Sequence, residues 1–222
     1  MLPPPGRGKA AAWLVLAAAA AITVAAWHLA RMDIERRNAE HFQVRTGSIR
    51  DAIDQHLRAY QQILRGGAGL FDAIQQVTRE DWRAYVQRLQ LEANYPGIQG
   101  LGFSLWIAPE ALDEHIRRIR AEGFPDYSPW PEGERRDYTA ILYLEPFDWR
   151  NRRAFGYDMF SEPVRRAAME KARDSGAVAV SGKVTLVQET EEDVQAGFLM
   201  YLAVYRPMQP PDPAALLGYV FG

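Results

Sequence analysis

The sequence predicts an α+β fold that follows a long N-terminal helical segment, and three observations support this class. An uncharged apolar run at residues 10–30 leads into a charged stretch with one apolar seam. Short helical and strand patterns then alternate irregularly, without the regular strand–helix–strand period of a doubly wound fold. The composition, with 48% hydrophobic and 11% aromatic residues, is sufficient for a packed core.

The N-terminal segment has the pattern of a membrane anchor. Residues 1–9 carry Arg7 and Lys9 and no acidic residue. Residues 10–30 read AAAWLVLAAAAAITVAAWHLA, with a tryptophan near each end. At ~1.5 Å per residue, a helix of this length crosses the ~30 Å hydrocarbon layer, and the basic tail predicts that the rest of the chain is exported. A cleaved signal peptide is the alternative, but the length of the run favours an uncleaved transmembrane helix.

Residues 31–65 are expected to form a stalk helix with one apolar face. The residues of this seam follow one another at spacings of 4, 4, 3 and 4: Ile49, Ile53, Leu57, Tyr60 and Leu64. The seam packs either on the domain that follows or on the same helix of a second chain, and both can hold along different parts of its length. We therefore expect a homodimer through the stalk. Gly66, Gly67 and Gly69 are expected to break the helix, so that a domain begins at residue 66.

Capping and turn residues place the elements of the first half of this domain. Thr78 has the form of an N-cap, and a short helix follows it. Residues 98–107 alternate apolar and small side chains, as a half-buried strand does. A further helix begins at Pro109 and ends at Gly123. Residues 140–144 form the next strand.

The second half begins with an extended segment at residues 154–160. Ser161 or Glu162 caps a helix that has Pro163 at its first position and ends at Gly176. An acidic hairpin loop is predicted at 189–193, and the remaining strands at 178–181, 183–188, 198–205 and 216–221. Because the chain stops inside the last of these strands, we expect it to be part of a longer protein.

Composition and spacing exclude several functional classes. The chain has no cysteine, which excludes disulfides, thiolate zinc sites and cysteine nucleophiles. Its 26 Lys+Arg against 28 Asp+Glu give a net charge of −2, without the basic excess of a nucleic-acid-binding protein. None of the four histidines has a partner at the spacing of a metal-binding helix face, and there is no G-x-S-x-G motif or complete phosphate loop. We therefore predict no catalytic residue, no metal and no cofactor.

An acidic cluster allows one enzymatic alternative. Glu145, Asp158 and Glu162 could supply the carboxylate pair of a membrane-anchored glycosidase-type hydrolase. Carboxylates at loops and helix caps are ordinary, however, and that interpretation is favoured. A dimerisation module without a small ligand is the third class.

Asp158 differs from the other acidic residues because it lies in a mostly aromatic segment. In an extended strand it points to the same side as Gly156 and Phe160. Burying a carboxylate there requires hydrogen-bond donors, from a helix N-terminus, from an arginine such as Arg152 or Arg153, or from a ligand. The sequence leaves an internal cap and a ligand contact open.

Several motifs resemble those of the bacterial CHASE domain, the extracytoplasmic sensor module of membrane-bound histidine kinases and nucleotide cyclases, including the plant cytokinin receptors. The similarity covers most of the chain after the stalk, in order and with similar spacing. The motifs are YPGIQGLG at 95–102, RAEGF at 120–124, LYLEP at 142–146, YDM at 157–159, SEPVR at 161–165, ARDSG at 172–176, SGKVTLVQE at 181–189, and GFL at 197–199 with VYRP at 204–207.

The resemblance implies a long stalk helix followed by two PAS-like subdomains with antiparallel sheets. In the plant receptors an adenine-type ligand donates hydrogen bonds to an aspartate of the membrane-distal subdomain, and that position is Asp158 here. A leucine and a threonine of the plant pocket fall at Val180 and at Tyr201. The bulk of Tyr201 implies a differently shaped pocket. Further wall candidates are strand residues near the implied sheet: Phe103, Leu105, Tyr143 and Phe160.

These observations predict the ligand-sensing part of a transmembrane receptor. The chain is expected in the bacterial cytoplasmic membrane with its sensor domain outside, binding a small, adenine-like molecule and no nucleic acid. The resemblance also implies an output domain beyond residue 222, either a histidine kinase or a diguanylate cyclase, after a second transmembrane helix. No enzyme activity is expected within the chain itself.

Overall fold

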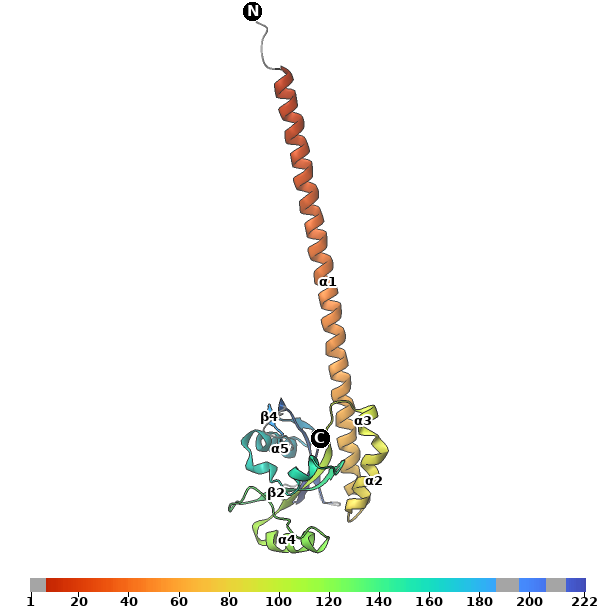
Figure 1. Cartoon of the computed structure of the whole chain (residues 1–222), viewed down its shortest axis with the longest axis vertical. Helices are drawn as coiled ribbons and strands as arrows, with labels where there is room; N and C mark the ends of the chain where they lie inside the picture. Colours follow the sequence, from red (N-terminus) through yellow and green to blue (C-terminus); the bar gives the residue numbers. More distant parts are fainter. Residues whose placement is uncertain (1–6, 187–195, 207–214) are drawn as a thin grey trace, which may run out of the picture. The chain divides into compact units, whose positions relative to one another are not determined.

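The computed structural model describes residues 7–186, 196–206 and 215–222, and the chain divides into two compact units, Met1–Gln55 and His56–Gly222. The fold is α+β (Figure 1). Its α-helices are α1 (Arg7–Ala73), α2 (Arg79–Leu89), α3 (Leu91–Asn94), α4 (Leu112–Ala121) and α5 (Pro163–Ser175). Its strands are β1 (Leu101–Ile107), β2 (Tyr138–Glu145), β3 (Ala179–Val180), β4 (Val184–Thr185), β5 (Ala196–Gly197), β6 (Met200–Tyr205) and β7 (Leu216–Phe221).

Helix α1 does not end at residue 65 as the glycines led us to expect. It continues to Ala73, because Gly66 and Gly67 serve close packing rather than helix termination. A Cβ at Gly66 would lie 2.5 Å from the hydroxyl oxygen of Tyr85, and one at Gly67 would lie 3.1 Å from the ring of Trp82. The missing side chains thus let α2 pack directly on the last turns of α1.

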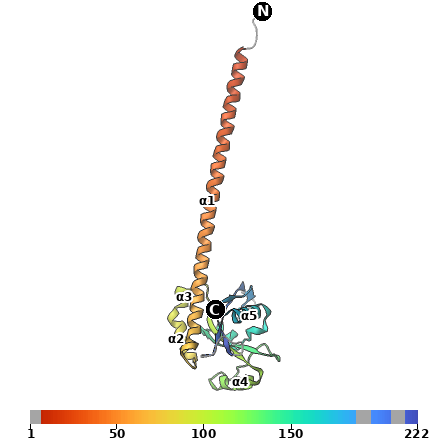
Figure 2. The same cartoon turned by 180° about the vertical axis from the view of Figure 1, so that it is seen from behind.

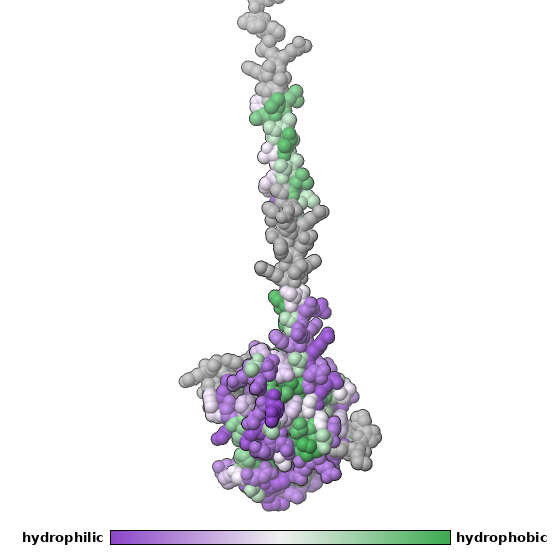
Figure 3. Space-filling view, turned by 90° about the vertical axis from the view of Figure 1, so that its right-hand side faces the viewer, coloured by the Kyte–Doolittle hydropathy of each residue, from purple (hydrophilic) through white to green (hydrophobic). Residues whose placement is uncertain are grey.

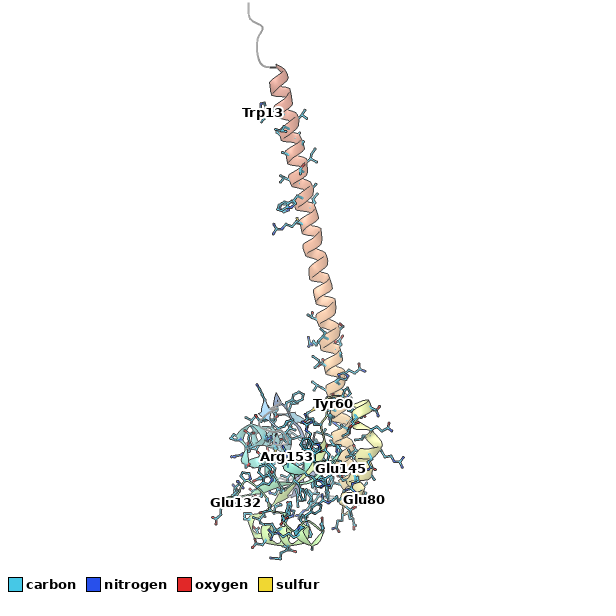
Figure 4. All side chains as sticks on the ribbon, viewed as in Figure 1. Trp13, Tyr60, Glu80, Glu132, Glu145 and Arg153 are labelled. Atoms are coloured by element: carbon cyan, nitrogen blue, oxygen red, sulfur yellow. The ribbon has the colours of Figure 1, made fainter. Side chains whose placement is uncertain are left out.

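The N-terminal part of α1 exposes apolar side chains. Trp13 and Trp27 are 68% and 60% exposed, and the described side chains between them are mostly hydrophobic (Figures 3 and 4). Among the residues that the structure describes, no helix has both the length and the apolar character required for a membrane span.

The centre of the second unit is an antiparallel five-stranded sheet with the order β2-β1-β7-β6-β3. Strand β1 pairs on one side with β2 and on the other with β7, and β7 in turn pairs with β6. The short strands β4 and β5 form a separate two-stranded sheet. The described residues thus contain one sheet of PAS size, and a second PAS-like subdomain stays a prediction.

The two faces of the large sheet pack against different helices (Figures 1 and 2). On one face Phe103, Leu202 and Val220 meet the last turns of α1 together with α2. On the other face Tyr201 and Tyr219 meet α5. This alternation follows the period of two along each strand.

Local capping signals place both α2 and α5 correctly. Thr78 forms a capping box with Asp81 at the start of α2. Between the two expected caps of α5, the structure selects Glu162, whose carboxylate accepts from the first-turn backbone N–H groups. Pro163 is the first residue of α5, and Gly176 ends the helix at φ 63°.

The segment before α5 is not the regular strand expected at residues 154–160. Two 3₁₀ turns, Asn151–Ala154 and Met159–Ser161, enclose isolated bridges at Tyr157 and Asp158. Tyr157, Asp158 and Met159 are all buried, because the turns remove the alternation between two faces. The acidic hairpin loop predicted at 189–193 lies outside the described residues.

Candidate ligand-binding site

Asp158 is a fully buried carboxylate with 0% exposure. Its Oδ1 accepts hydrogen bonds from the backbone N–H and the hydroxyl of Thr139, both at 2.9 Å, and from the backbone N–H of Phe160 at 3.1 Å. Asp158 therefore caps the 3₁₀ turn Met159–Ser161, whereas Glu162 caps α5. These three donors offset much of the cost of burying Oδ1.

The second carboxylate oxygen of Asp158 has no hydrogen bond. Nη1 of Arg135 lies 3.4 Å from Oδ2, an ion-pair distance without hydrogen-bond geometry. An arginine thus lies beside Asp158, but it is neither Arg152 nor Arg153, the two examples named from the sequence. Their guanidinium groups instead lie over the rings of Phe147 and Trp149. Asp158 thus keeps one buried acceptor without a donor.

Arg135 connects Asp158 to a pocket of about 730 Å³. The pocket is lined by Trp106, Arg135, Arg136, Asp137, Phe160, Arg166, Glu170, Arg173 and Leu216. Its volume falls within the range that holds small-molecule ligands. Asp158 does not itself line this pocket.

Three elements carry most of the pocket wall. Arg166, Glu170 and Arg173 follow one another at spacings of 4 and 3, which places them on one face of α5. The loop before β2 supplies Arg135, whose Nη2 donates to the carbonyl of Pro131 at 2.9 Å. Trp106 of β1 meets Phe160 edge to face, with ring centroids 5.3 Å apart.

Two tyrosines of the same sheet face keep buried hydroxyls without hydrogen-bond partners, Tyr201 and Tyr219. Burial raises the pKa of both phenols, and the positive charges of Arg165 and Arg173 respectively oppose this rise. Both phenols therefore remain protonated hydrogen-bond donors at neutral pH.

The structure divides the predicted site residues between three places. Tyr201 and Phe160 lie on the α5 side of the sheet and Asp158 lies beside the edge strand β2, and of these only Phe160 lines the pocket. Phe103 and Tyr143 belong to the opposite face, where Phe103 packs on Phe71 of α1 and the Tyr143 hydroxyl donates to the carbonyl of Val77.

The two remaining predicted residues also lie outside the pocket lining. Leu105 is half-buried and packs on the α1/α2 side. Val180, at the edge strand β3, is 46% exposed. The predicted residues thus do not form one cavity.

The acidic cluster does not have the arrangement of a hydrolase pair. Oε1 of Glu145, labelled in Figure 4, lies 3.1 Å from Nε of Arg83, and Glu162 caps α5. Asp158 is inaccessible to solvent. Glycosidase carboxylates must flank an open cleft, so the geometry disfavours this alternative. Among the described residues no group of histidine and acidic side chains could hold a metal ion.

The arginines and Trp106 of the pocket were not predicted from the sequence. The spacing of Arg166, Glu170 and Arg173 was a visible signal for a polar face of α5. Nothing in the sequence joined that face to Arg135 and Arg136, because a loop and a helix meet only through tertiary packing.

The comparison with known families shows to which family this chain belongs. The family model of the CHASE domain matches residues 75–222. The chain belongs to the CHASE domain family. No curated protein matches the chain. CHASE domains are sensory domains of signalling receptors, not catalytic domains, and the resemblance noted in the sequence is thereby confirmed.

Proposed function

We propose that this CHASE domain is the ligand-binding part of a membrane-anchored receptor, and that a small molecule binds in the pocket beside Arg135 and Phe160. The observation that carries the proposal is the buried carboxylate of Asp158, which keeps one acceptor without a donor and is linked through Arg135 to the pocket. Burying an incompletely satisfied carboxylate is costly, and such groups concentrate at functional sites.

The pocket wall suits a planar ligand, such as an adenine-like ring. Trp106 and Phe160 offer aromatic surfaces against which a ring can pack. A small movement of the Arg135 guanidinium would open or close its contact with Oδ2 of Asp158. Ligand binding at Arg135 is therefore coupled to the buried carboxylate.

We propose further that residues 10–30 anchor the receptor in the bacterial cytoplasmic membrane. The apolar character of these residues and the basic residues Arg7 and Lys9 before them support this arrangement, with the sensor domain outside the membrane. The signal would reach a histidine kinase or diguanylate cyclase domain by a change in the relative populations of two arrangements of a stalk homodimer.

The test of the site is the substitution Asp158→Asn in the 222-residue chain. Isothermal titration calorimetry with purines is expected to show at least about tenfold weaker binding, because the amide leaves Arg135 without its ion-pair partner. Asp113→Asn, which changes an exposed carboxylate of α4, is the matched control and should bind as the wild type does.

Circular dichroism of the Asp158→Asn chain checks that the fold is intact. Phe160→Leu provides a second variant, because Phe160 lines the pocket and is not fully buried. Wild-type affinity in both folded variants would exclude the assignment of this pocket.

A further inference from the structure

The pocket beside Asp158 carries an excess of positive charge. Four arginines line it, Arg135, Arg136, Arg166 and Arg173, against the acidic residues Asp137 and Glu170. The chain as a whole has a net charge of −2, so this excess is local. A hollow lined by one sign of charge concentrates ligands of the opposite sign.

Arg166 is the least compensated of these charges. Its Nε donates to the carbonyl of Phe160 at 2.7 Å and its Nη2 to the carbonyl of Ser161 at 3.3 Å. In the described part of the chain no carboxylate lies within ion-pair distance of this guanidinium. The two carbonyls fix the position of the group without neutralising it.

Arg136 and Arg173, which also line the pocket, each have an acidic neighbour that leaves some of the guanidinium donors free. Nε of Arg173 lies 2.8 Å from Oδ1 of Asp174, and Nε of Arg136 lies 3.8 Å from Oδ2 of Asp137. A guanidinium has five N–H donors, so each retains several for a ligand. Arg136 has a side chain that is 98% exposed and can turn toward a bound group.

A buried tyrosine next to Trp106 of the pocket wall lacks a hydrogen-bond acceptor. Tyr219 is 0% exposed and its hydroxyl has no hydrogen-bond partner. Its ring centroid lies 6.5 Å from that of Trp106, which lines the pocket. The charges of Arg173 and Glu170, also in the lining, act on this phenol. Its unpaired hydroxyl is thus a buried polar group without a partner beside the pocket wall, although Tyr219 itself does not line the pocket.

We propose that the ligand of this pocket carries an anionic group, a carboxylate or a phosphate, bound by Arg166, Arg173 and Arg136, while its planar part packs on Trp106 and Phe160. This inference rests on the proposed function, since it names the chemistry of the small molecule that the pocket binds. Planar guanidinium groups bind carboxylate and phosphate oxygens through paired, charge-assisted hydrogen bonds. A neutral ring alone would leave the guanidinium of Arg166 without a counterion.

The test compares ligands that differ only in charge. Adenosine and AMP form one pair, and nicotinamide and nicotinate form another. In titration calorimetry of the wild-type chain, at least one anion is expected to bind about tenfold more tightly than its neutral partner. This preference is expected to shrink when the salt concentration is raised, because the arginines are partly exposed to solvent. Preference within the first pair identifies a phosphate ligand, and preference within the second a carboxylate ligand.

Substitutions locate the effect in the pocket. Arg173→Gln and Arg136→Gln are each expected to weaken binding of the preferred anion by about tenfold and to reduce its advantage over the neutral partner. Lys171→Gln is the matched control, since it removes the same charge from an exposed position of α5 outside the pocket. It should leave the preference unchanged.

The outcomes separate this inference from the proposed function. Equal binding of charged and neutral partners, or an anion preference that both arginine variants retain, overturns the inference while a binding pocket remains. If neither pair binds, the proposed function fails and the inference fails with it.

Discussion

His115 is a titratable group held in its neutral form by its surroundings. The side chain is 5% exposed, its Nε2 shares a 2.8 Å hydrogen bond with the hydroxyl of Tyr127, and a guanidinium nitrogen of Arg118 lies 3.3 Å from its Nδ1. Burial lowers the pKa of His115 from 6.5 to about 4, and the positive charge of Arg118 acts in the same direction. A proton on this ring is therefore unfavourable in the folded domain.

Because of this histidine, we expect the folded domain to lose stability in mild acid. In the unfolded chain His115 binds a proton near its ordinary pKa, whereas in the folded chain it does so only near pH 4. Above about pH 6.5 the neutral ring of His115 therefore makes its full contribution to the free energy of unfolding. As the pH drops toward 4, this contribution falls by on the order of 2–3 kcal/mol. Urea unfolding of the wild type and of His115→Gln measures it. The difference in the free energy of unfolding between the wild type and the variant should narrow with falling pH, and a constant difference would contradict the prediction.

At the scale of the element, α1 shows why glycines in a sequence do not always end a helix. Gly66 and Gly67 face α2, where Tyr85 donates from its hydroxyl to the carbonyl of Ile63 at 2.6 Å. Gly69 has open space around it, with no atom within 4 Å of the place that a Cβ would take. Packing on α2 stabilises the helix at positions where intrinsic propensity disfavours it.

The two positions predict opposite effects of the same substitution. Gly69→Ala should raise the free energy of unfolding by about 0.5–1 kcal/mol, because alanine restricts the unfolded chain and meets no obstacle in the helix. Gly66→Ala should lower it by about 1–3 kcal/mol, because the Cβ displaces the Tyr85 hydroxyl from the Ile63 carbonyl. Thermal unfolding of both variants tests this, and a stabilised Gly66→Ala chain would refute the packing argument.

Elements with local signals could be predicted from the sequence, and those formed by tertiary contacts could not. Thr78 and Glu162 cap their helices through atoms a few residues away, so α2 and α5 were placed correctly. The 3₁₀ turn Met159–Ser161 after Asp158 depends on contacts with Thr139, nineteen residues before Asp158 in the chain. The pocket depends on the meeting of Arg135 with α5. For this reason the sequence could predict that Asp158 needs donors but not which arginine lies beside it.

At the scale of the whole molecule, the apolar seam of α1 is buried in one part and exposed in another. Leu57, Tyr60 and Leu64 pack within the unit His56–Gly222, where Leu64 is 1% exposed. Ile49 and Ile53, in the unit Met1–Gln55, are 59% and 53% exposed. The same spacing continues through both units, so the first part of the seam keeps a face that a second copy of the helix can cover.

In a parallel stalk homodimer, we expect an introduced cysteine to form a disulfide between the two chains at one face of α1 only. The chain contains no cysteine, so a single introduced thiol reports on contact between two copies. Ile53→Cys in the full chain should form a disulfide-linked dimer under mild oxidation, because seam residues of a parallel pair bring their Cα atoms within the roughly 4.4–6.8 Å that the bond requires. Gln55→Cys, about 200° away around the helix, is also exposed and should remain monomeric on a non-reducing gel. Equal cross-linking at both positions would indicate random collision. If the Ile53→Cys chain forms no cross-linked dimer, this seam is excluded as the dimer contact.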